Sequence, residues 1–360
     1  MCLCAPFSVM SESQAQSFAE GSSIPPVTPD ASPEAVALLK FIQGISGRHT
    51  LTGQHNYPNT RDASSREAVL TSGKEPAIFG QDFGFSADGD IDAVSARPAN
   101  MAEVVRQFRR GAIITLCWHA VRPVDDEPAT FSGSVQARLT DRQWSDLVTP
   151  GTAIHERWCA QVDVIAKYLK ELQAARVPVL WRPYHEMNGD WFWWGGRPGE
   201  HGSVALFRML FDRLVRHHGI NNLVWIWNVD RPIEHRGTFA SYFPGADCFD
   251  IASLDIYDGD FSPAYYAGLL KLAAGKPIAL TEVGLPPTIA ILESQPKWTW
   301  WMEWAEILPK QGTQEWSALR TLVDDPRSWS LSDAGYIEAT APIRTASGLP
   351  EGPQTSLPVR

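Results

Sequence analysis

Short apolar runs alternate along the chain with longer segments of helical periodicity. Residues 153–175 show the i, i+3, i+4 spacing of an amphipathic helix, with apolar side chains at Val162, Ile165, Ala166, Leu169 and Leu172. The apolar runs are short and rich in β-branched or aromatic residues, which is typical of strands. Eight runs predict strands: 50–54, 77–82, 112–119, 177–184, 223–228, 250–257, 277–282 and 298–304.

Eight strands with helices between most of them predict a single-domain α/β protein with the (β/α)8 fold, the TIM barrel. A doubly wound open sheet is the alternative, but such a sheet usually carries a glycine-rich phosphate-binding turn after its first strand. The sequence T-G-Q-H-N-Y after the first run is no such turn. The barrel is therefore favoured.

Composition shifts at the two ends predict the domain limits. Residues 11–33 are rich in Ser, Pro, Ala and Gln, and residues 340–360 are rich in Pro, Gly and Thr without apolar periodicity. We expect a flexible N-terminal tail over 1–33, a barrel over 34–339 and a C-terminal tail over 340–360. Residues 122–151 lack clear periodicity, and as a loop after the third strand they are expected to form one wall of a cleft.

The charge and composition narrow the range of partners. The net charge of −10, from 31 basic and 41 acidic residues, has the wrong sign for binding nucleic acid or an anionic membrane surface. No apolar run approaches the roughly 20 residues of a membrane span, and the first ten residues lack the basic region of a signal peptide. Five cysteines without a C-x-x-C pair predict buried free thiols, and fifteen tryptophans suggest a flat, uncharged ligand.

Two glutamates stand where apolar runs stop. Glu186 follows V-P-V-L-W-R-P-Y-H at the end of the fourth run, and Glu282 follows K-P-I-A-L-T at the end of the seventh. Functional side chains of a TIM barrel come from the C-terminal ends of its strands, so these two would face each other across the barrel mouth. Such a pair can cleave an acetal, because one carboxyl protonates the leaving oxygen while the other attacks the anomeric carbon. For either glutamate alone, a solvated loop charge is the alternative.

The residues around Glu186 match the chemistry of a sugar. Sugars present a rim of hydroxyls and apolar C–H faces, so their sites combine hydrogen-bonding side chains with flat rings. The sequence W-R-P-Y-H-E-M-N-G-D-W-F-W-W-G-G supplies both kinds: Arg182, His185 and Asn188 as donors, and Trp191, Trp193 and Trp194 as rings. Neighbouring rings cannot all point into one cleft, so packing remains the alternative for each tryptophan.

These motifs resemble the signature of the family 26 glycoside hydrolases, the β-mannanases of a large clan of retaining (β/α)8 enzymes. The resemblance extends to C-W-H at 117–119, L-D-I-Y at 254–257, L-T-E-V-G at 280–284 and W-T-W-W-M-E-W at 298–304, and so covers most of the chain between residues 50 and 333. It implies that Glu186 is the acid/base, that Glu282 is the nucleophile, and that no cofactor takes part.

The resemblance also implies which residues contact the substrate. His119, His185 and Tyr257 would hold the sugar and the nucleophile beside the cleaved bond, and Trp191 would line the leaving-group side. Each of these residues also has a structural alternative: His119 as a strand-end histidine, Tyr257 as a rim tyrosine, and Trp304 as a barrel-floor ring without ligand contact. The full set of substrate-binding candidates is His119, Arg182, His185, Asn188, Trp191, Trp194, Tyr257 and Trp304.

Arg182 lies four residues before Glu186 on a predicted strand, so both side chains would point to the same side of the sheet. Its charge can sustain an ionised nucleophile, and a structural salt bridge is the alternative.

Some weaker candidates rest on position alone. These are Gln54, His55 and Asp82, at the ends of the first two runs. Asp255 and Asp258 flank Tyr257 and resemble a metal-binding pair, but the sequence shows no group of ligands at metal spacing. Glycosidic cleavage by two carboxylates needs no metal, so none is expected.

The sequence therefore predicts a retaining endo-β-1,4-mannanase: a monomer with an open cleft for β-mannan polysaccharide or manno-oligosaccharide. The resemblance implies a secreted or extracytoplasmic protein, although no clear signal peptide is present. Two alternatives stay open. One is the same fold and mechanism acting on β-1,3-xylan or mixed-linkage β-glucan. The other is a catalytically silent carbohydrate-binding barrel, against which the presence of both glutamates argues.

Overall fold

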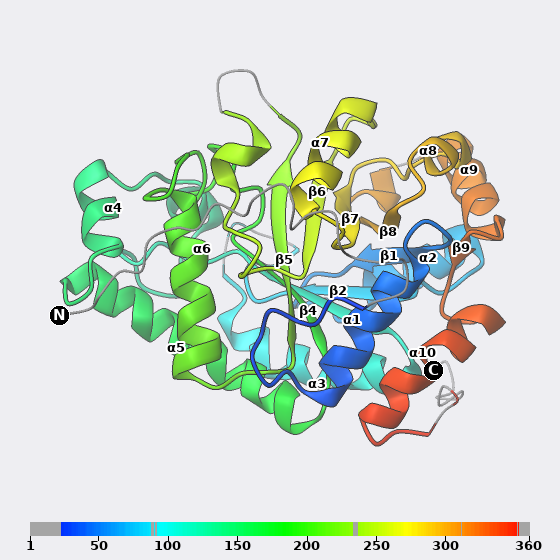
Figure 1. The fold of residues 1–360 in the computed structure, drawn as a ribbon, viewed down its shortest axis with the longest axis horizontal. Helices are drawn as coiled ribbons and strands as arrows, with labels where there is room; N and C mark the ends of the chain where they lie inside the picture. Colours follow the sequence, from blue (N-terminus) through cyan, green and yellow to red (C-terminus); the bar gives the residue numbers. More distant parts are fainter. Residues whose placement is uncertain are drawn as a thin grey trace.

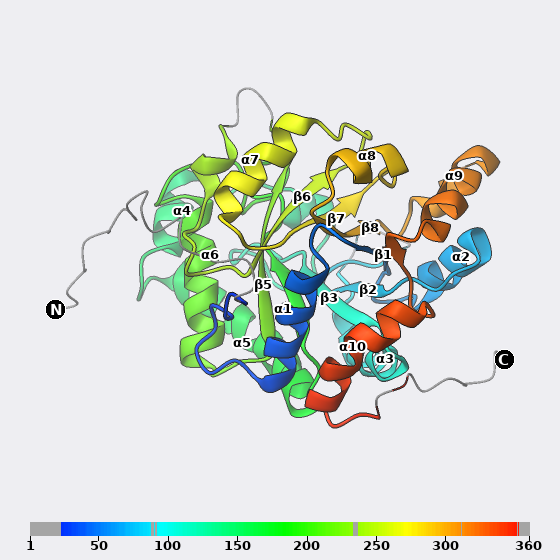
Figure 2. The ribbon, with the colours of Figure 1, turned by 45° about the vertical axis from the view of Figure 1, so that its right-hand side comes forward.

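The eight predicted strands form one closed parallel barrel. The computed structural model describes residues 23–350 and 352, apart from 88–89, 91, 233–236 and 311. The sheet closes because β1 (Thr50–His55) pairs with both β2 (Ile78–Asp82) and β8 (Trp298–Glu303), and Figures 1 and 2 show helices around it. The other barrel strands are β3 (Ile113–Trp118), β4 (Val179–Pro183), β5 (Leu223–Asp230), β6 (Ile251–Ile256) and β7 (Ile278–Val283). The predicted (β/α)8 fold is confirmed.

The apolar runs of the sequence arise from burial on both faces of the sheet. Every residue of β1 to β8 is buried, because side chains alternate between the barrel interior and the surrounding helices. A ninth strand, β9 (Ser328–Trp329), pairs with the first residues of β1. The sequence did not predict it, since two residues are too few to show a periodicity.

Amphipathic helices cover the barrel. The apolar face predicted for 153–175 is confirmed in α5 (Ala153–Ala174), where Val162, Ile165, Ala166, Leu169 and Leu172 are buried. No helix among the described residues is both long enough and apolar enough to cross a membrane. The remaining helices are α1 (Pro33–Ile45), α2 (Ala63–Ser72), α3 (Arg97–Arg110), α4 (Asp141–Leu147), α6 (Ser203–Phe211), α7 (Pro263–Ala273), α8 (Ile289–Ser294), α9 (Thr313–Asp324) and α10 (Ala334–Ala346).

The expected N-terminal boundary at residue 33 needs correction. The described part of the predicted tail begins at Ser23 and packs on the barrel: the Val27 amide donates to Asp250 Oδ1 at 2.8 Å, and Thr28 is buried. Residues 1–22 lie outside the described part of the chain, as do Cys2 and Cys4. The other cysteines, Cys117, Cys159 and Cys248, are buried free thiols as predicted.

The expected C-terminal tail from residue 340 also needs correction. Helix α10 continues to Ala346, and Figures 1 and 2 show it beside α1. Its buried face is formed by Tyr336, Thr340, Ile343 and Arg344. Because two of these four are polar and Pro342 lies within the helix, the sequence did not show a helical apolar pattern.

The aperiodic segment 122–151 contributes a wall of the cleft, as predicted. It contains a π-helical turn, Phe131–Val135, and the short helix α4. Phe131, Ser132 and Gln136 line the cleft described below. Elements of five and seven residues are too short to produce a visible periodicity.

Packing of α10 gives a stability prediction. Ile343→Ala should lower the free energy of unfolding by about 2 to 5 kcal/mol, because the side chain is buried at 3% exposure and its removal leaves a cavity. Glu338→Ala, on the exposed face of the same helix, should change it by less than about 0.5 kcal/mol. Urea unfolding measures both variants, and equal midpoints would show that α10 does not belong to the core.

Candidate active site

A cleft of about 860 Å³ lies at the C-terminal ends of the barrel strands. Its lining includes both glutamates singled out in the sequence, Glu186 and Glu282. These ends are where a parallel barrel places functional side chains, since each strand delivers its last residues to the same face. Of the predicted substrate-binding residues, the cleft is lined by His119, His185, Trp191, Tyr257 and Trp304.

Glu282, on β7, is held by a buried cation. The Arg182 guanidinium, 1% exposed, donates through Nη2 to Glu282 Oε1 and through Nη1 to Asp255 Oδ2 at 2.9 Å. A buried carboxylate that is paired in this way is favoured in its charged form. Arg182 itself does not line the cleft. Its predicted substrate-binding role therefore needs correction: it lies beneath Glu282 and acts through that carboxylate.

Two further groups approach Glu282 from the cleft side. The Tyr257 hydroxyl donates to Glu282 Oε2 at 2.5 Å, and His185 Nε2 lies 3.8 Å from Oε1. Burial of the hydroxyl and the negative charge of Glu282 raise the pKa of Tyr257 well above its usual value, so the hydroxyl remains a donor. Burial also lowers the pKa of His185 well below its usual value, so its imidazole is neutral.

Glu186 lies in an environment that favours its proton. Burial raises the pKa of Glu186 well above its usual value, and the negative charges of Glu282 and Asp255 raise it further. Trp191 Nε1 donates to Glu186 Oε2, and the Glu186 amide donates to Asn228 Oδ1 at 2.6 Å. The two glutamates thus have opposite surroundings, since one faces a guanidinium and the other faces carboxyl groups.

The backbone leaves the strand before Glu186. Strand β4 ends at Pro183, and Tyr184 and Glu186 have φ angles of 47° and 50° in the left-handed region. Strand alternation therefore does not align Arg182 with Glu186, because Glu186 lies beyond the strand, and that expectation is wrong. Both side chains nevertheless reach the region around Glu282. A sequence pattern cannot reveal such a turn when neither residue is glycine.

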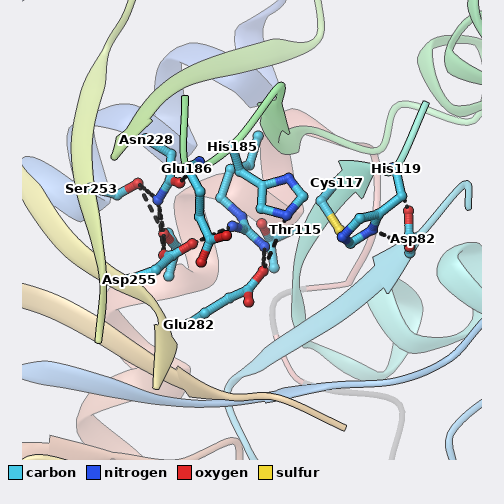
Figure 3. A network of polar contacts seen from close by, with 12 residues as sticks. Asp82, Thr115, Cys117, His119, His185, Glu186, Asn228, Ser253, Asp255 and Glu282 are labelled. Carbon is cyan, nitrogen blue, oxygen red and sulfur yellow. Dashed lines mark hydrogen bonds and ion pairs between the residues drawn. The ribbon is translucent and has the colours of Figure 1, made fainter. Parts of the chain in front are cut away.

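Three carboxyl groups converge in this region. One oxygen each of Glu186, Asp255 and Glu282 lies within 4.8 Å of the others. Figure 3 shows the three side chains near one another. Asp255 accepts from Asn228 Nδ2 at 2.9 Å and from Thr281 Oγ1 at 2.7 Å. Burial and the charge of Glu282 raise the pKa of Asp255 to about 8, against the attraction of Arg182. The predicted proximity of Glu186 and Glu282 is present, and Asp255 joins them.

The structure also brings groups of ligand atoms to metal spacing, which the sequence did not show. Besides the three carboxyl groups, these are Asp82 with Cys117 and His119, and Asp163 with His217 and His218. Side chains of each group already form hydrogen bonds within the protein. Arg182 bonds two of the three carboxyls, Asp82 bonds His119, and Arg213 bonds both oxygens of Asp163. Asp258, the other half of the suspected pair, forms an ion pair with Arg231 instead.

His119 lies on the side of His185 that is away from Glu186, as Figure 3 shows. Its Nδ1 lies 2.7 Å from Asp82 Oδ2, and its backbone amide donates to Asp82 Oδ1 at 3.2 Å. Burial alone would raise the pKa of Asp82, but the charge of His119 and its hydrogen bond hold it below the usual value. Asp82, a weak candidate from the sequence, thus lines the cleft and orients the His119 ring.

Two other predicted contacts need correction. Trp194 is fully buried and donates through Nε1 to the His185 carbonyl at 2.8 Å. Asn188 is 1% exposed and exchanges hydrogen bonds with the backbone of Asp230. Neither lines the cleft, so both support the loop after β4. Trp193 likewise packs, with Nε1 bonded to the Ala120 carbonyl at 2.7 Å.

Several cleft residues were not found from the sequence. Phe85 and Phe131 contribute rings, and Asp230 and Arg231 contribute charges. Asp230 ends β5, so its position at the end of an apolar run was an available signal. Phe85 lies outside the named strands and Phe131 begins the π-helical turn, so neither ends an apolar run and neither gave such a signal.

Comparison with known proteins identifies relatives over most of the chain. The family model described as "Glycosyl hydrolase family 26" matches residues 27–333. A protein of Thermothelomyces thermophilus named "Mannan endo-1,4-beta-mannosidase" is 32% identical over 303 residues, which cover 82% of this chain and 59% of the relative. The chain spans 44% to 59% of the length of the first three curated relatives it matches.

Solved structures give the same relationship. A GH26A structure from Muricauda sp. MAR_2010_75 is 38% identical with a TM-score of 0.79, and the match covers 84% of this chain and 98% of that one. A β-mannanase from a symbiotic protist of the termite Reticulitermes speratus, solved with a gluco-manno-oligosaccharide, is 26% identical with a TM-score of 0.71. That match covers 86% of this chain and 97% of the other.

The carboxyl cluster yields a prediction about titration. Glu282→Gln should lower the pKa of Glu186 toward its ordinary value, because it removes the negative charge that opposes ionisation of Glu186. NMR titration of protein labelled with ¹³C at the glutamate carboxyl carbons measures this shift, with Glu186→Gln to assign the signal. Glu338→Gln, on the protein surface, should leave it unchanged. A Glu186 pKa that stays constant in Glu282→Gln would contradict the proposed coupling.

Proposed function

Because the chain belongs to glycosyl hydrolase family 26, we propose that it is a retaining endo-β-1,4-mannanase acting through Glu186 and Glu282. The observation that carries this proposal is the pair itself: two carboxyl groups in one cleft, with oxygens within 4.8 Å and opposite electrostatic surroundings. Retaining glycosidases place their carboxyl groups roughly 5 to 5.5 Å apart, whereas inverting enzymes need roughly 6.5 to 9.5 Å to admit a water molecule. One oxygen of each carboxyl within 4.8 Å of the other is compatible with the shorter of these separations, and so supports double displacement.

Glu282 has the surroundings of a nucleophile. Arg182 and Tyr257 bond its two oxygens and stabilise the carboxylate, which attacks the anomeric carbon and forms a glycosyl–enzyme bond. Their hydrogen bonds also fix the direction of the lone pairs, so less reorganisation is needed at the moment of attack.

Glu186 has the surroundings of an acid/base. Its raised pKa keeps the proton that the leaving oxygen needs in the first step. Once that proton has left, the Glu186 carboxylate takes a proton from the water that cleaves the glycosyl–enzyme bond. Covalent attachment of the sugar neutralises Glu282 and removes one source of repulsion, so Glu186 can remain ionised until this second step.

The cleft offers different surfaces on the two sides of the bond. Trp191 bonds Glu186 and so lies on the side of the leaving group, where its ring can stack on the departing sugar. His119, His185 and Trp304 lie around the place of the sugar that becomes attached to Glu282. The proposal includes contact between these residues and the substrate. It also includes a barrel that forms one catalytic domain.

The relatives named as mannan endo-1,4-beta-mannosidases support mannan as the substrate, and the β-mannanase solved with a gluco-manno-oligosaccharide supports oligosaccharides. A monomeric state and a place outside the cytoplasm belong to the same proposal. β-1,3-Xylan and mixed-linkage β-glucan remain as outcomes of the test.

The test combines a substrate screen with two variants. The wild-type protein should release reducing sugar from mannan and galactomannan faster than from xylan or β-glucan. Glu282→Ala should abolish turnover of every substrate, whereas Glu186→Ala should retain activity on aryl mannosides with an acidic phenol, because that leaving group needs little protonation. Glu338→Ala, on an exposed helix face, serves as the matched control and should behave as wild type.

Three outcomes of this test would contradict the proposal. Greater activity on xylan or β-glucan than on mannan would show that mannan is not the preferred substrate. Binding of mannan without turnover would indicate a carbohydrate-binding barrel. Equal loss by Glu186→Ala and Glu282→Ala on the activated substrate would contradict the division of roles.

Trp191 gives a second prediction. Trp191→Ala should lower kcat/KM on manno-oligosaccharides by about tenfold for each 1.4 kcal/mol of lost transition-state binding, and should change stability little because the ring is half-buried. Trp191→Phe loses the hydrogen bond to Glu186 but keeps a ring that can stack on the sugar. Because of that ring, it should retain more activity than the alanine variant. Both should act nearly as wild type on the activated aryl mannoside.

Trp193→Ala is the packing counterpart for this experiment. Its ring is 1% exposed, and its removal should cost roughly 3 to 5 kcal/mol of stability. A Trp191→Ala variant that melts as early as Trp193→Ala, or that loses equal activity on both kinds of substrate, would assign Trp191 to the core.

A further inference from the structure

His55 lies directly beneath a wall of the cleft and has no part in the mechanism above. It is the last residue of β1 and is fully buried. Its ring stacks on the indole of Trp304 with centroids 3.6 Å apart and an angle of 12° between the planes. Trp304 lines the cleft, whereas His55 does not. One face of the Trp304 ring is therefore covered by a flat side chain from a neighbouring strand.

Other rings hold the edges of the same stack. Tyr57 contacts His55 at 5.9 Å and Trp304 at 6.2 Å between centroids, both with nearly perpendicular planes. His119 lies 5.8 Å from Trp304, also edge-on. Perpendicular contacts at the edges and a parallel contact beneath leave the indole little freedom to tilt.

Hydrogen bonding does not explain the place of His55. Neither of its ring nitrogens has a hydrogen-bond partner among the described residues. Burial lowers its pKa to about 3, against the attraction of Asp82 and with further lowering by Arg182 and His119, so the ring is neutral and not a partner in an ion pair. The parallel contact that its ring makes is the stack on Trp304.

A second histidine–tryptophan stack shows what a purely structural pair looks like in this protein. His49 stacks on Trp329 with centroids 3.8 Å apart and an angle of 17°. His49 precedes β1 and Trp329 belongs to β9, at the opposite end of β1 from the cleft, and neither residue lines the cleft. The two stacks share their geometry and differ in what the tryptophan faces.

We propose that His55 is a positioning residue that fixes the plane of Trp304, and through it the orientation of the sugar that Glu282 attacks. This inference rests on the proposed function, because it assumes that Trp304 contacts that sugar. A ring held in one plane presents the same surface in the free and bound states, so binding does not have to immobilise it. The imidazole of His55 supplies a flat surface for this purpose, parallel to the indole to within 12°.

Three variants test the role. His55→Leu removes the flat ring while keeping an apolar side chain, and should lower kcat/KM about tenfold or more on both a manno-oligosaccharide and an activated aryl mannoside, since both place a sugar against Trp304. His55→Phe restores a flat ring and should recover most of that loss. His49→Leu removes the matched stack and should leave kcat/KM unchanged, even if it lowers the melting temperature.

Crystal structures of the three variants provide a readout that needs no activity. The Trp304 ring should leave its plane in His55→Leu and keep it in His55→Phe and His49→Leu. The proposal is overturned if Trp304 stays in place in His55→Leu, if His55→Leu is folded and retains wild-type kcat/KM, or if His49→Leu loses as much activity as His55→Leu.

Failure of the proposed function gives a different result. If the wild-type protein cleaves no β-glycan, the mannanase proposal fails. The orientation of Trp304 in the crystal structures then still decides whether His55 positions that ring.

Discussion

The candidate site depends on a charge imbalance: three buried carboxyl groups share one buried guanidinium. Arg182 bonds Glu282 and Asp255, and Glu186 lies within reach of both carboxyls. Ionising all three would leave uncompensated negative charge in a buried place, which is costly. Burial and the repulsion between these carboxyls therefore raise the pKa of Glu186 and the pKa of Asp255, while the Arg182 guanidinium bonds Glu282 and Asp255. Two chemically identical side chains, Glu186 and Glu282, thus have different electrostatic surroundings.

Asn228 converts that electrostatic arrangement into a fixed geometry. From β5, its Nδ2 donates to Asp255 on the neighbouring strand β6 and to Thr281 on β7, and its Oδ1 accepts from the Glu186 amide. The last contact matters because Glu186 adopts a left-handed φ, a conformation that costs a non-glycine residue about 1 to 3 kcal/mol. One amide side chain thus helps to hold a strained backbone and orients a carboxyl of the cluster. Removing it would loosen both.

The sequence predicted what depends on local pattern and missed what depends on side-chain direction. Apolar runs gave all eight barrel strands, and the ends of two runs gave Glu186 and Glu282, because a parallel barrel brings strand ends together whatever the loops do. Arg182 and Trp194 were assigned to the substrate, yet they point below the cleft and into the core. Arg182 lies within β4, where alternation alone does not separate a side chain beneath Glu282 from one that lines the cleft. Trp194 lies beyond the turn after Pro183, which no residue preference announces.

The tryptophan content illustrates the same limit at the level of composition. Fifteen tryptophans suggested a flat ligand, but among the described tryptophans the cleft is lined by Trp191 and Trp304 alone. Ten others are almost fully buried: Trp118, Trp158, Trp181, Trp193, Trp194, Trp225, Trp227, Trp298, Trp300 and Trp301. Large rings fill the space between the barrel and its helices as well as they stack on sugars, so their number reports packing. What separates the two uses is position. Trp304 directly follows β8, where it is covered by His55 on one side and borders the cleft, and a tryptophan within a strand has no such surface.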